Sequence, residues 1–252
     1  MIKVDRVLIT GLENALYGMR LPKASHDKSD TICTVYDKNT GDLIKGVHIN
    51  NITSSMIPLE TEIGKNDLKL ANNLVIAGSD HGKWLRQVQL SLLIEAPMTF
   101  WWDADTYKVA TVKNSSSRMH KITSKELNEN DFSWDNEDGK VVLDEFRENQ
   151  LKHLNKLIKS YNDYNLLIED NKSSIDYKKE LIKSQKLVFE RIIQDLPDSY
   201  NFRALWTGSC QTARNFYFAR KNHKQKEMRE LANIFANLEN VGRFITTTET
   251  IK

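Results

Sequence analysis

Apolar residues in the first part of the chain follow the spacing of strands. The segment 3–10 is rich in β-branched and other apolar residues, which predicts a largely buried strand. The runs 31–36 and 43–50 flank a stretch of turn-forming residues and predict a β-hairpin. Residues 84–95 alternate between apolar and polar side chains and end just before Pro97, which predicts a further strand.

Helical spacing dominates the second part of the chain. Residues 144–168 and 173–194 both carry apolar side chains at helical intervals. The connection between them is short and polar, so we expect an antiparallel helical hairpin. A hydroxyl-rich segment, 114–118, has too few apolar residues to belong to the core and is predicted to be a loop. The other segments with helical character are 66–77, 98–108, 202–220 and 225–238. The pattern predicts an α+β fold with a small antiparallel sheet and long helices.

Composition and charge narrow the class of protein. The chain is 40% hydrophobic and 28% charged, and no apolar run approaches the roughly 20 residues that span a bilayer. A formal net charge of +2 argues against a surface built to coat a polymeric nucleic acid, although a local basic pocket for a nucleotide is compatible with it. The first residues lack the apolar core of a secretory signal, so we expect a cytoplasmic location and no membrane partner.

The residue types that usually build metal or nucleotide sites are scattered. Cys33 and Cys210 are far apart in the sequence and are expected to be buried or incidental thiols. The six histidines show no paired spacing, so no metal site is predicted. The sequence contains no Walker-type phosphate loop and no strand-linked glycine fingerprint of a dinucleotide fold.

One segment carries side chains suited to binding an anion. Asn114-Ser-Ser-Ser-Arg118 combines hydroxyls with a guanidinium, and these groups can hold a phosphate or a polarised carbonyl. Such a run is more often a solvated loop. Arg220 lies in an aromatic helical segment, where an arginine is usually a surface group. The residues alone therefore indicate an α+β protein with one candidate anion site.

The span 81–119 resembles the flavin-dependent thymidylate synthases. That family carries an Arg-His-Arg-x-x-Ser-x-Asn-Glu-x-Ser-x-Arg signature after a strand that ends in Ala-Pro. Here Ala96-Pro97 ends the strand, and residues 106–118 read Thr-Tyr-Lys-Val-Ala-Thr-Val-Lys-Asn-Ser-Ser-Ser-Arg. The second serine and the final arginine of the signature correspond to Ser116 and Arg118. The segment Asn215-Phe-Tyr-Phe-Ala-Arg220 is similar to the family's Asn-Phe-Leu-x-Leu-Arg.

The resemblance implies a fold and a reaction. It implies a single domain over residues 1–252 like that of the flavin-dependent thymidylate synthases, with a helical hairpin inserted at about 144–194. It implies reductive methylation of dUMP to dTMP, with FAD as cofactor and with methylenetetrahydrofolate and NADPH as co-substrates. It also implies a homotetramer.

By position, the resemblance implies roles for individual side chains. Arg220 and Ser116 correspond to catalytic positions, and Arg220 is expected to polarise the uracil. The nucleotide-binding positions are Asn114, Ser115, Ser116, Ser117, Arg118 and Arg220. The flavin-binding positions are His81, Lys83, Thr106, Tyr107, Lys108, Asn114, Gln211 and Asn215.

The departures from the signature leave two alternatives open. Thr106-Tyr107-Lys108 stands where the family has Arg-His-Arg, and a lysine does not replace a bidentate guanidinium. The nucleotide-side residues persist better than the flavin-side ones. One alternative is an enzyme of the same fold that modifies another pyrimidine nucleotide. The other is a non-catalytic nucleotide-binding homologue that has lost the flavin.

Overall fold

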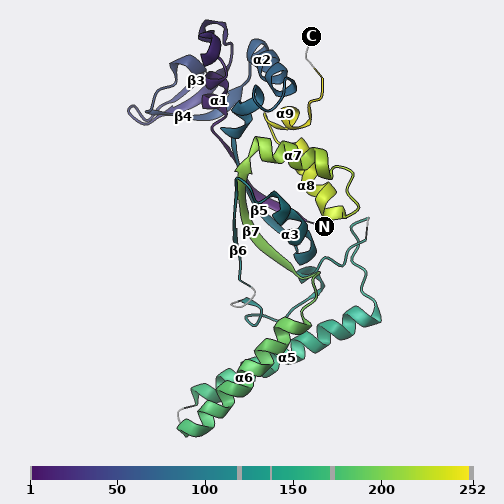
Figure 1. The fold of residues 1–252 in the computed structure, drawn as a ribbon. Coiled ribbons are helices and arrows are strands. Elements are labelled where there is room, and N and C mark those ends of the chain that lie inside the picture. The colour runs from purple at the N-terminus through teal and green to yellow at the C-terminus, as the bar shows by residue number, and fades with distance from the viewer. Residues whose placement is uncertain (1, 118–120, 137, 171–173, 250–252) are drawn as a thin grey trace. The chain divides into compact units, whose positions relative to one another are not determined.

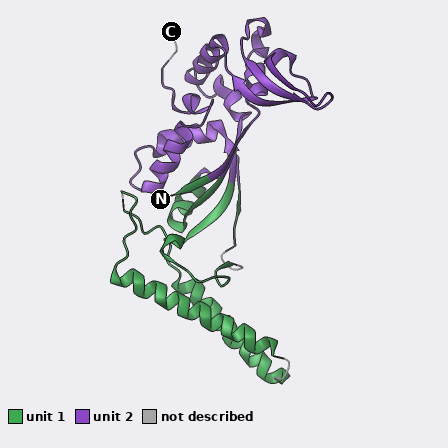
Figure 2. Cartoon of the chain, turned by 180° about the vertical axis from the view of Figure 1, so that it is seen from behind, with its two compact units in different colours: residues 1–4, 93–106, 113–205 green, residues 5–92, 107–112, 206–252 purple. Residues whose placement is uncertain are grey.

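The computed structural model describes residues 2–117, 121–136, 138–170 and 174–249 (Figure 1). The chain divides into two units (Figure 2). Unit 1 comprises residues 1–4, 93–106 and 113–205. Unit 2 comprises residues 5–92, 107–112 and 206–252. None of the helices in the described residues is long and apolar enough to cross a membrane.

Unit 2 contains a three-stranded antiparallel sheet in the order β3-β2-β4. Its strands are β2 (Ile32–Asp37), β3 (Leu43–His48) and β4 (Met56–Glu62). The predicted β-hairpin is confirmed as β2 and β3, because Ile32 pairs with His48 and Tyr36 with Leu43. The sequence pattern missed β4, which contains a proline and lies at the edge of the sheet, where a missing N–H is tolerated.

Two of the helices of unit 2 begin and end close to where the sequence predicts. The helices of this unit are α1 (Leu12–Gly18), α2 (Lys65–Ile76), α7 (Cys210–Arg220), α8 (Lys226–Ala236) and α9 (Gly242–Thr246). The predicted helix over 66–77 is confirmed as α2, and Gly78 follows its end with a positive φ of 109°. The prediction over 225–238 is confirmed as α8.

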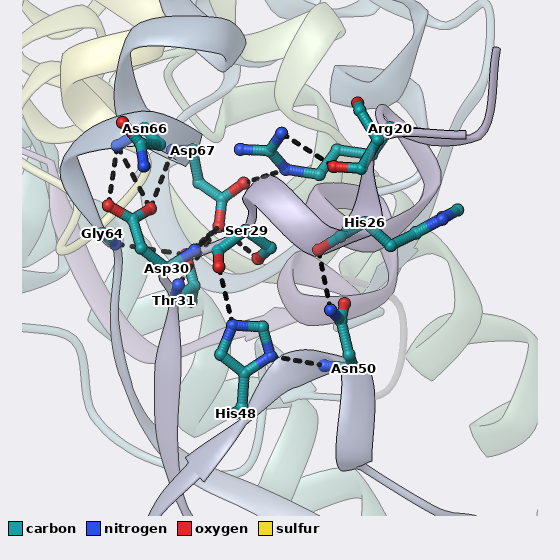
Figure 3. Close-up of polar contacts among 11 residues, drawn as sticks. Arg20, His26, Ser29, Asp30, Thr31, His48, Asn50, Gly64, Asn66 and Asp67 are labelled. Carbon is teal, nitrogen blue, oxygen red and sulfur yellow. Dashed lines mark hydrogen bonds and ion pairs between the residues drawn. The ribbon is translucent and has the colours of Figure 1, made fainter. Parts of the chain in front are cut away.

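A buried carboxylate holds α2 in place (Figure 3). Asp67 is fully buried and forms an ion pair with Arg20 at 2.5 Å, while the hydroxyls of Ser29 and Thr31 each donate to its Oδ2 at 2.6 Å. The Asp30 carboxylate accepts from the first backbone N–H groups of α2, so it caps the start of this helix. These contacts join the segment before β2, the end of α1 and the first turn of α2.

A second sheet has four strands in the order β1-β5-β7-β6. Its strands are β1 (Lys3–Thr10), β5 (Gln89–Pro97), β7 (Asn201–Ser209) and β6 (Thr111–Ser115). The central strand β5 buries Leu90, Leu92 and Ile94 almost completely, as its alternating pattern predicts. The predicted burial of 3–10 is wrong, because β1 lies at the sheet edge and most of its side chains are exposed.

Three sequence predictions around this sheet are corrected. The strand predicted from residue 84 begins only at Gln89, because Gly82–Arg86 forms a 3-10 turn, η4. The helix predicted over 98–108 is shorter, with α3 at Met98–Ala104 and a 3-10 turn at Asp105–Tyr107. The predicted loop 114–118 begins inside β6, whose last residues are Asn114 and Ser115.

The helix predicted over 202–220 is wrong in its first half. Residues Asn201–Ser209 form β7, and only Cys210–Arg220 is helical. Phe202, Ala204 and Trp206 recur every second residue, which is the period of a strand. The change occurs at Ser209, whose hydroxyl accepts from the Thr212 backbone N–H and caps α7.

Unit 1 consists mainly of a helical hairpin and the core beneath it. The hairpin predicted from residues 144–168 and 173–194 is confirmed as α5 (Glu145–Glu169) and α6 (Ile175–Asp195), which pack side by side. Asp144 and Ser174 cap their first turns. Phe132 and Trp134 stack at 4.2 Å in the core cluster at the base of the hairpin. The buried members of this cluster are Ile122, Leu127, Phe132, Trp134, Leu154, Ile158, Ile192 and Leu196.

The Asp67–Arg20 pair predicts a large and pH-dependent contribution to stability. We expect Asp67→Asn to lower the free energy of unfolding by about 3–5 kcal/mol, because it leaves the buried Arg20 guanidinium without its counter-charge. Chemical denaturation at neutral pH measures this loss. The matched control is Asp195→Asn, which removes the partly exposed His153–Asp195 pair and is expected to cost at most about 1 kcal/mol.

The pH dependence follows from the direction of the pKa shift. Burial opposes ionisation of Asp67, but hydrogen bonds from Ser29, Thr31 and Arg20 and the charge of Arg20 lower its pKa below the usual 3.8. The ionised carboxylate therefore adds stability that is present above the unfolded pKa and is lost as the pH falls through the folded one. We expect this acid loss in the wild type and a smaller one in Asp67→Asn. Equal acid profiles would contradict the assignment.

Candidate functional site

The hydroxyl-rich segment of unit 1 is fixed by the backbone of β7. The Ser116 N–H donates to the Arg203 carbonyl oxygen at 2.8 Å, and the Ser116 hydroxyl oxygen accepts from the Arg203 N–H at 3.3 Å. Ser116 therefore continues the β6 edge beyond its last strand residue. Its hydroxyl hydrogen is available to a further acceptor, because the hydroxyl acts as an acceptor toward Arg203.

A small recess in unit 1 brings the hydroxyls next to cationic side chains. Its volume is about 200 Å³, and both Ser116 and Ser117 line it. The Lys125 ammonium pairs with Asp131 at 2.5 Å, and Arg203 pairs with Glu95 at 3.3 Å. Hydroxyls beside ammonium and guanidinium groups suit a phosphate-sized anion. The recess is lined by the cationic side chains of Lys121, Lys125 and Arg203 and by the carboxylates of Glu95 and Asp131.

Sequence reasoning missed these three cationic residues. The available signal was the presence of Lys121 and Lys125 shortly after the serine run. Arg203 had no such signal, because its segment was predicted to be a helix. Asn114 and Ser115 are exposed on β6 and do not line the recess. The predicted anion-binding residue Arg118 lies outside the described residues.

Thr106, the first residue of the altered signature, makes a local contact. It is exposed in unit 1, and its hydroxyl donates to the Asp103 carbonyl oxygen at 2.8 Å. Nearby, Lys113 pairs with Asp105 at 2.6 Å and its ammonium lies 5.1 Å from the Trp101 ring centroid. Lys113 on β6 thus contacts Asp105 in the turn and Trp101 on α3.

In unit 2, helix α7 presents two predicted flavin-side residues as a pair. The Gln211 side-chain amide donates to the Asn215 amide oxygen at 2.9 Å, one helical turn apart. Asn215 is exposed and Gln211 is half-buried. The pair leaves amide donors and acceptors available at the surface of the helix.

The same helix carries Arg220 in contact with Tyr107. The Arg220 guanidinium carbon lies 5.4 Å from the centroid of the Tyr107 ring, and that ring lies 4.9 Å from the Phe216 ring. The Nε atom of Arg220 is buried and has no hydrogen-bond partner among the described residues. Buried donors normally have an acceptor, so an unpaired one indicates a group that a ligand can satisfy. Lys108, next to Tyr107, is exposed.

His81 and Lys83 line a separate hollow of unit 2. This hollow has a volume of about 640 Å³, and it lies between the ends of α1 and α2 and the 3-10 turn η4. Trp84 also lines it; this side chain is 2% exposed, and its Nε1 has no hydrogen-bond partner in the described part of the chain. The turn η4 packs against α7. Both His81 and Lys83 are exposed at the hollow.

Neither cysteine is a candidate nucleophile. Cys33 and Cys210 are both free and buried, which confirms the expectation of buried thiols. Burial raises the pKa of the Cys33 thiol and raises the pKa of Cys210 to about 12. The described residues contain no group of three or more His, Cys, Asp or Glu side chains that could hold a metal ion.

Comparisons with known proteins identify similar sequences and folds. The family model described as thymidylate synthase complementing protein matches residues 31–241. A search of curated proteins found no match. A crystal structure of thymidylate synthase X from Helicobacter pylori with FAD and dUMP has a TM-score of 0.58 at 15% identity, over 97% of each chain.

A second structure gives the same result. The flavin-dependent thymidylate synthase of Helicobacter pylori, complexed with FAD and dUMP, also has a TM-score of 0.58 at 15% identity. The similarity covers 99% of this chain and 100% of that one. At this level of identity, the two structures show that the fold is shared.

The two thiols are expected to be unreactive in the folded protein. With a Cys210 pKa of about 12 and a raised Cys33 pKa, the thiolate fraction of both is very small at pH 8. A disulfide reagent should therefore label neither thiol rapidly in the native protein. After denaturation it should label both. Rapid labelling of either cysteine in the native state would contradict the burial described above.

Proposed function

Because the chain belongs to the thymidylate synthase complementing protein family, whose members are flavin-dependent thymidylate synthases that methylate dUMP, we propose that it converts dUMP to dTMP by reductive methylation. The family match over 31–241 carries this proposal. FAD is the proposed cofactor, and both similar solved structures contain FAD and dUMP. We propose methylenetetrahydrofolate as the carbon donor and NADPH as the reductant.

Arg220 is the residue proposed to polarise the uracil. Its guanidinium donates to a uracil carbonyl oxygen and stabilises the negative charge that develops there during the reaction. The observation that supports this role is the buried and unpaired Nε atom, which leaves the guanidinium uncommitted to any protein acceptor in the described residues. Its contact with the Tyr107 ring limits the orientations of the side chain.

The recess in unit 1 is proposed to hold the nucleotide phosphate. Ser116 and Ser117 offer hydroxyl donors, and Lys121 adds positive charge, whereas the charge of Lys125 is balanced by Asp131. Ser116 donates its hydroxyl hydrogen to the nucleotide while its oxygen accepts from Arg203. The exposed residues Asn114 and Ser115, together with Arg118, complete the proposed nucleotide-binding set.

The residues proposed to hold FAD offer groups that fit its ring system. The exposed amides of Gln211 and Asn215 supply donors and acceptors for the polar edge of a flavin. His81 and Lys83 line a hollow of about 640 Å³ whose wall includes an unpaired Trp84 Nε1. When bound, FAD supplies the hydride and carries the one-carbon unit, and the protein binds and orients the reactants and excludes water.

The altered signature changes the charge that this site offers the cofactor. Thr106, Tyr107 and Lys108 keep one positive charge where the family signature has two arginines and a histidine. Lys108 is exposed and available to a phosphate of FAD as a point charge. We therefore expect weaker and more salt-sensitive FAD binding than an intact Arg-His-Arg signature provides.

Two broader properties belong to the same proposal. We propose that the chain assembles as a homotetramer, as the family resemblance implies. We also propose a cytoplasmic location, and two free buried thiols are compatible with a reducing compartment.

The first test is turnover with defined reactants. Purified protein loaded with FAD, NADPH and methylenetetrahydrofolate should convert dUMP to dTMP, which mass spectrometry detects, and should leave dCMP and UMP unchanged. Arg220→Ala should lower the turnover at least about 100-fold, because one charge-stabilising donor in an active site contributes about that much. Full turnover in Arg220→Ala, or a wild type that methylates a different nucleotide, would contradict the assignment.

The second test concerns the phosphate recess. Lys121→Glu should raise the KM for dUMP about tenfold and leave kcat nearly unchanged, because it reverses one charge next to the phosphate. The matched control is Lys156→Glu on the exposed side of α5. Calorimetry should show that Lys121→Glu weakens dUMP binding while deoxyuridine, which lacks the phosphate, binds the variant and the wild type equally. Equal loss for both ligands would contradict a phosphate contact.

A further inference from the structure

Tyr107, the middle residue of the altered signature, packs on the row of α7 side chains that carries Arg220. Its ring centroid lies 5.4 Å from the Arg220 guanidinium carbon and 4.9 Å from the Phe216 ring. Phe216 and Arg220 are one turn apart on α7, so the ring spans this turn. The Thr111 hydroxyl donates to the Tyr107 carbonyl oxygen at 3.0 Å, which fixes the Tyr107 backbone within the turn before β6.

Arg220 differs from the other buried or half-buried arginines of unit 2. Arg214, on the same helix, donates to the Phe244 and Ile245 carbonyl oxygens at 3.0 Å each. Arg20 pairs with a buried carboxylate. No hydrogen bond or ion pair holds the Arg220 guanidinium within the described residues, and its Nε is buried without a partner.

The Arg220 guanidinium is therefore held by a cation–π contact with the Tyr107 ring rather than by a hydrogen bond or an ion pair within the described residues. An aromatic face attracts a guanidinium placed within about 6 Å of its centroid, and it does so without using the N–H groups. The ring also restricts a long side chain that would otherwise lose much conformational entropy when a ligand fixed it. An uncharged phenol places no second positive charge beside Arg220, as an imidazolium at this position would.

We propose that Tyr107 is a positioning residue for Arg220. Its ring holds the guanidinium at the end of α7 and leaves the N–H groups free for the substrate. This inference rests on the proposed function and assigns Tyr107 a role on the nucleotide side rather than the flavin-lining role that the resemblance implies. On this proposal, the tyrosine that stands in place of the family's histidine positions Arg220 instead of lining the flavin.

The experiment compares two substitutions of Tyr107 that distinguish the aromatic ring from its hydroxyl. Tyr107→Leu removes the aromatic face, and Tyr107→Phe keeps it and removes only the hydroxyl. Calorimetry measures dUMP and FAD affinities of the full-length protein, and steady-state kinetics measure kcat and KM for dUMP. The matched control is Tyr36→Leu, which removes another partly exposed tyrosine on the three-stranded sheet of the same unit.

The expected result is specific to the nucleotide side. Tyr107→Leu should lower kcat/KM for dUMP and weaken dUMP binding by roughly 3- to 30-fold, the range of a guanidinium–ring contact. Tyr107→Phe should stay within about twofold of the wild type, and the FAD affinity should be unchanged in both variants. Tyr36→Leu should change neither affinity.

A double-mutant cycle tests whether Tyr107 acts through Arg220. In the Arg220→Ala background, Tyr107→Leu should cause no further loss of dUMP affinity, because the group that the ring holds is gone. Additive losses would overturn the proposal. Weaker FAD binding with unchanged dUMP binding in Tyr107→Leu would also overturn it and restore the flavin-lining role.

The outcomes separate this inference from the proposed function. A wild type that binds dUMP but forms no dTMP contradicts the synthase function, while the dUMP affinities still decide whether Tyr107 and Arg220 are coupled. A wild type that forms dTMP with Tyr107→Leu unchanged contradicts only the positioning role. A wild type that binds no dUMP contradicts both.

Discussion

The fold of unit 2 depends on one buried negative charge. Asp67 has no exposed surface, so its carboxylate is tolerated only because Arg20, Ser29 and Thr31 satisfy it completely. These partners come from segments that are far from α2 in the sequence, so the carboxylate fixes the positions of α1, the start of β2 and α2 together. Because α2 leads through Gly78 into η4, the same constraint positions His81 and Lys83 at their hollow.

Helix α7 is positioned by aromatic packing rather than by charge. Phe235 on α8 contacts both Trp206 and Phe216 at 5.6 Å between ring centroids, and Phe216 contacts Tyr107. Besides this packing, Arg214 on α7 donates to the Phe244 and Ile245 carbonyl oxygens, whereas Arg220 and the Gln211–Asn215 pair make no such contact with another element within the described residues. Arg220 and the Gln211–Asn215 pair are therefore available to ligands. The recess of unit 1 is built differently, because a strand backbone fixes its serine and surface cations surround it.

The periodic spacing of apolar residues correctly predicted the elements that are set by their local sequence. The β2–β3 hairpin, α2, α5, α6 and α8 all follow their local spacing, and their caps, such as Asp144 and Ser174, are visible in the sequence. The pattern failed where strand and helix follow one another without a break, as at Ser209. It also failed at β1, because a run of apolar residues does not reveal that a strand lies at a sheet edge.

The sequence by itself determined the family, through the order and spacing of Ser116, Arg118, Asn215 and Arg220. It also determined the type of most elements, because the spacing of apolar residues is a local property of the chain. Only the tertiary structure decided which distant side chains meet. The Arg20–Asp67 pair, the cations around Ser116 and the contact of Tyr107 with Arg220 all join separate segments. No periodicity encodes such contacts, since they arise only when topology and burial bring the segments together. The role of the altered signature is therefore inferred from the contact of Tyr107 with Arg220 and not from the sequence alone.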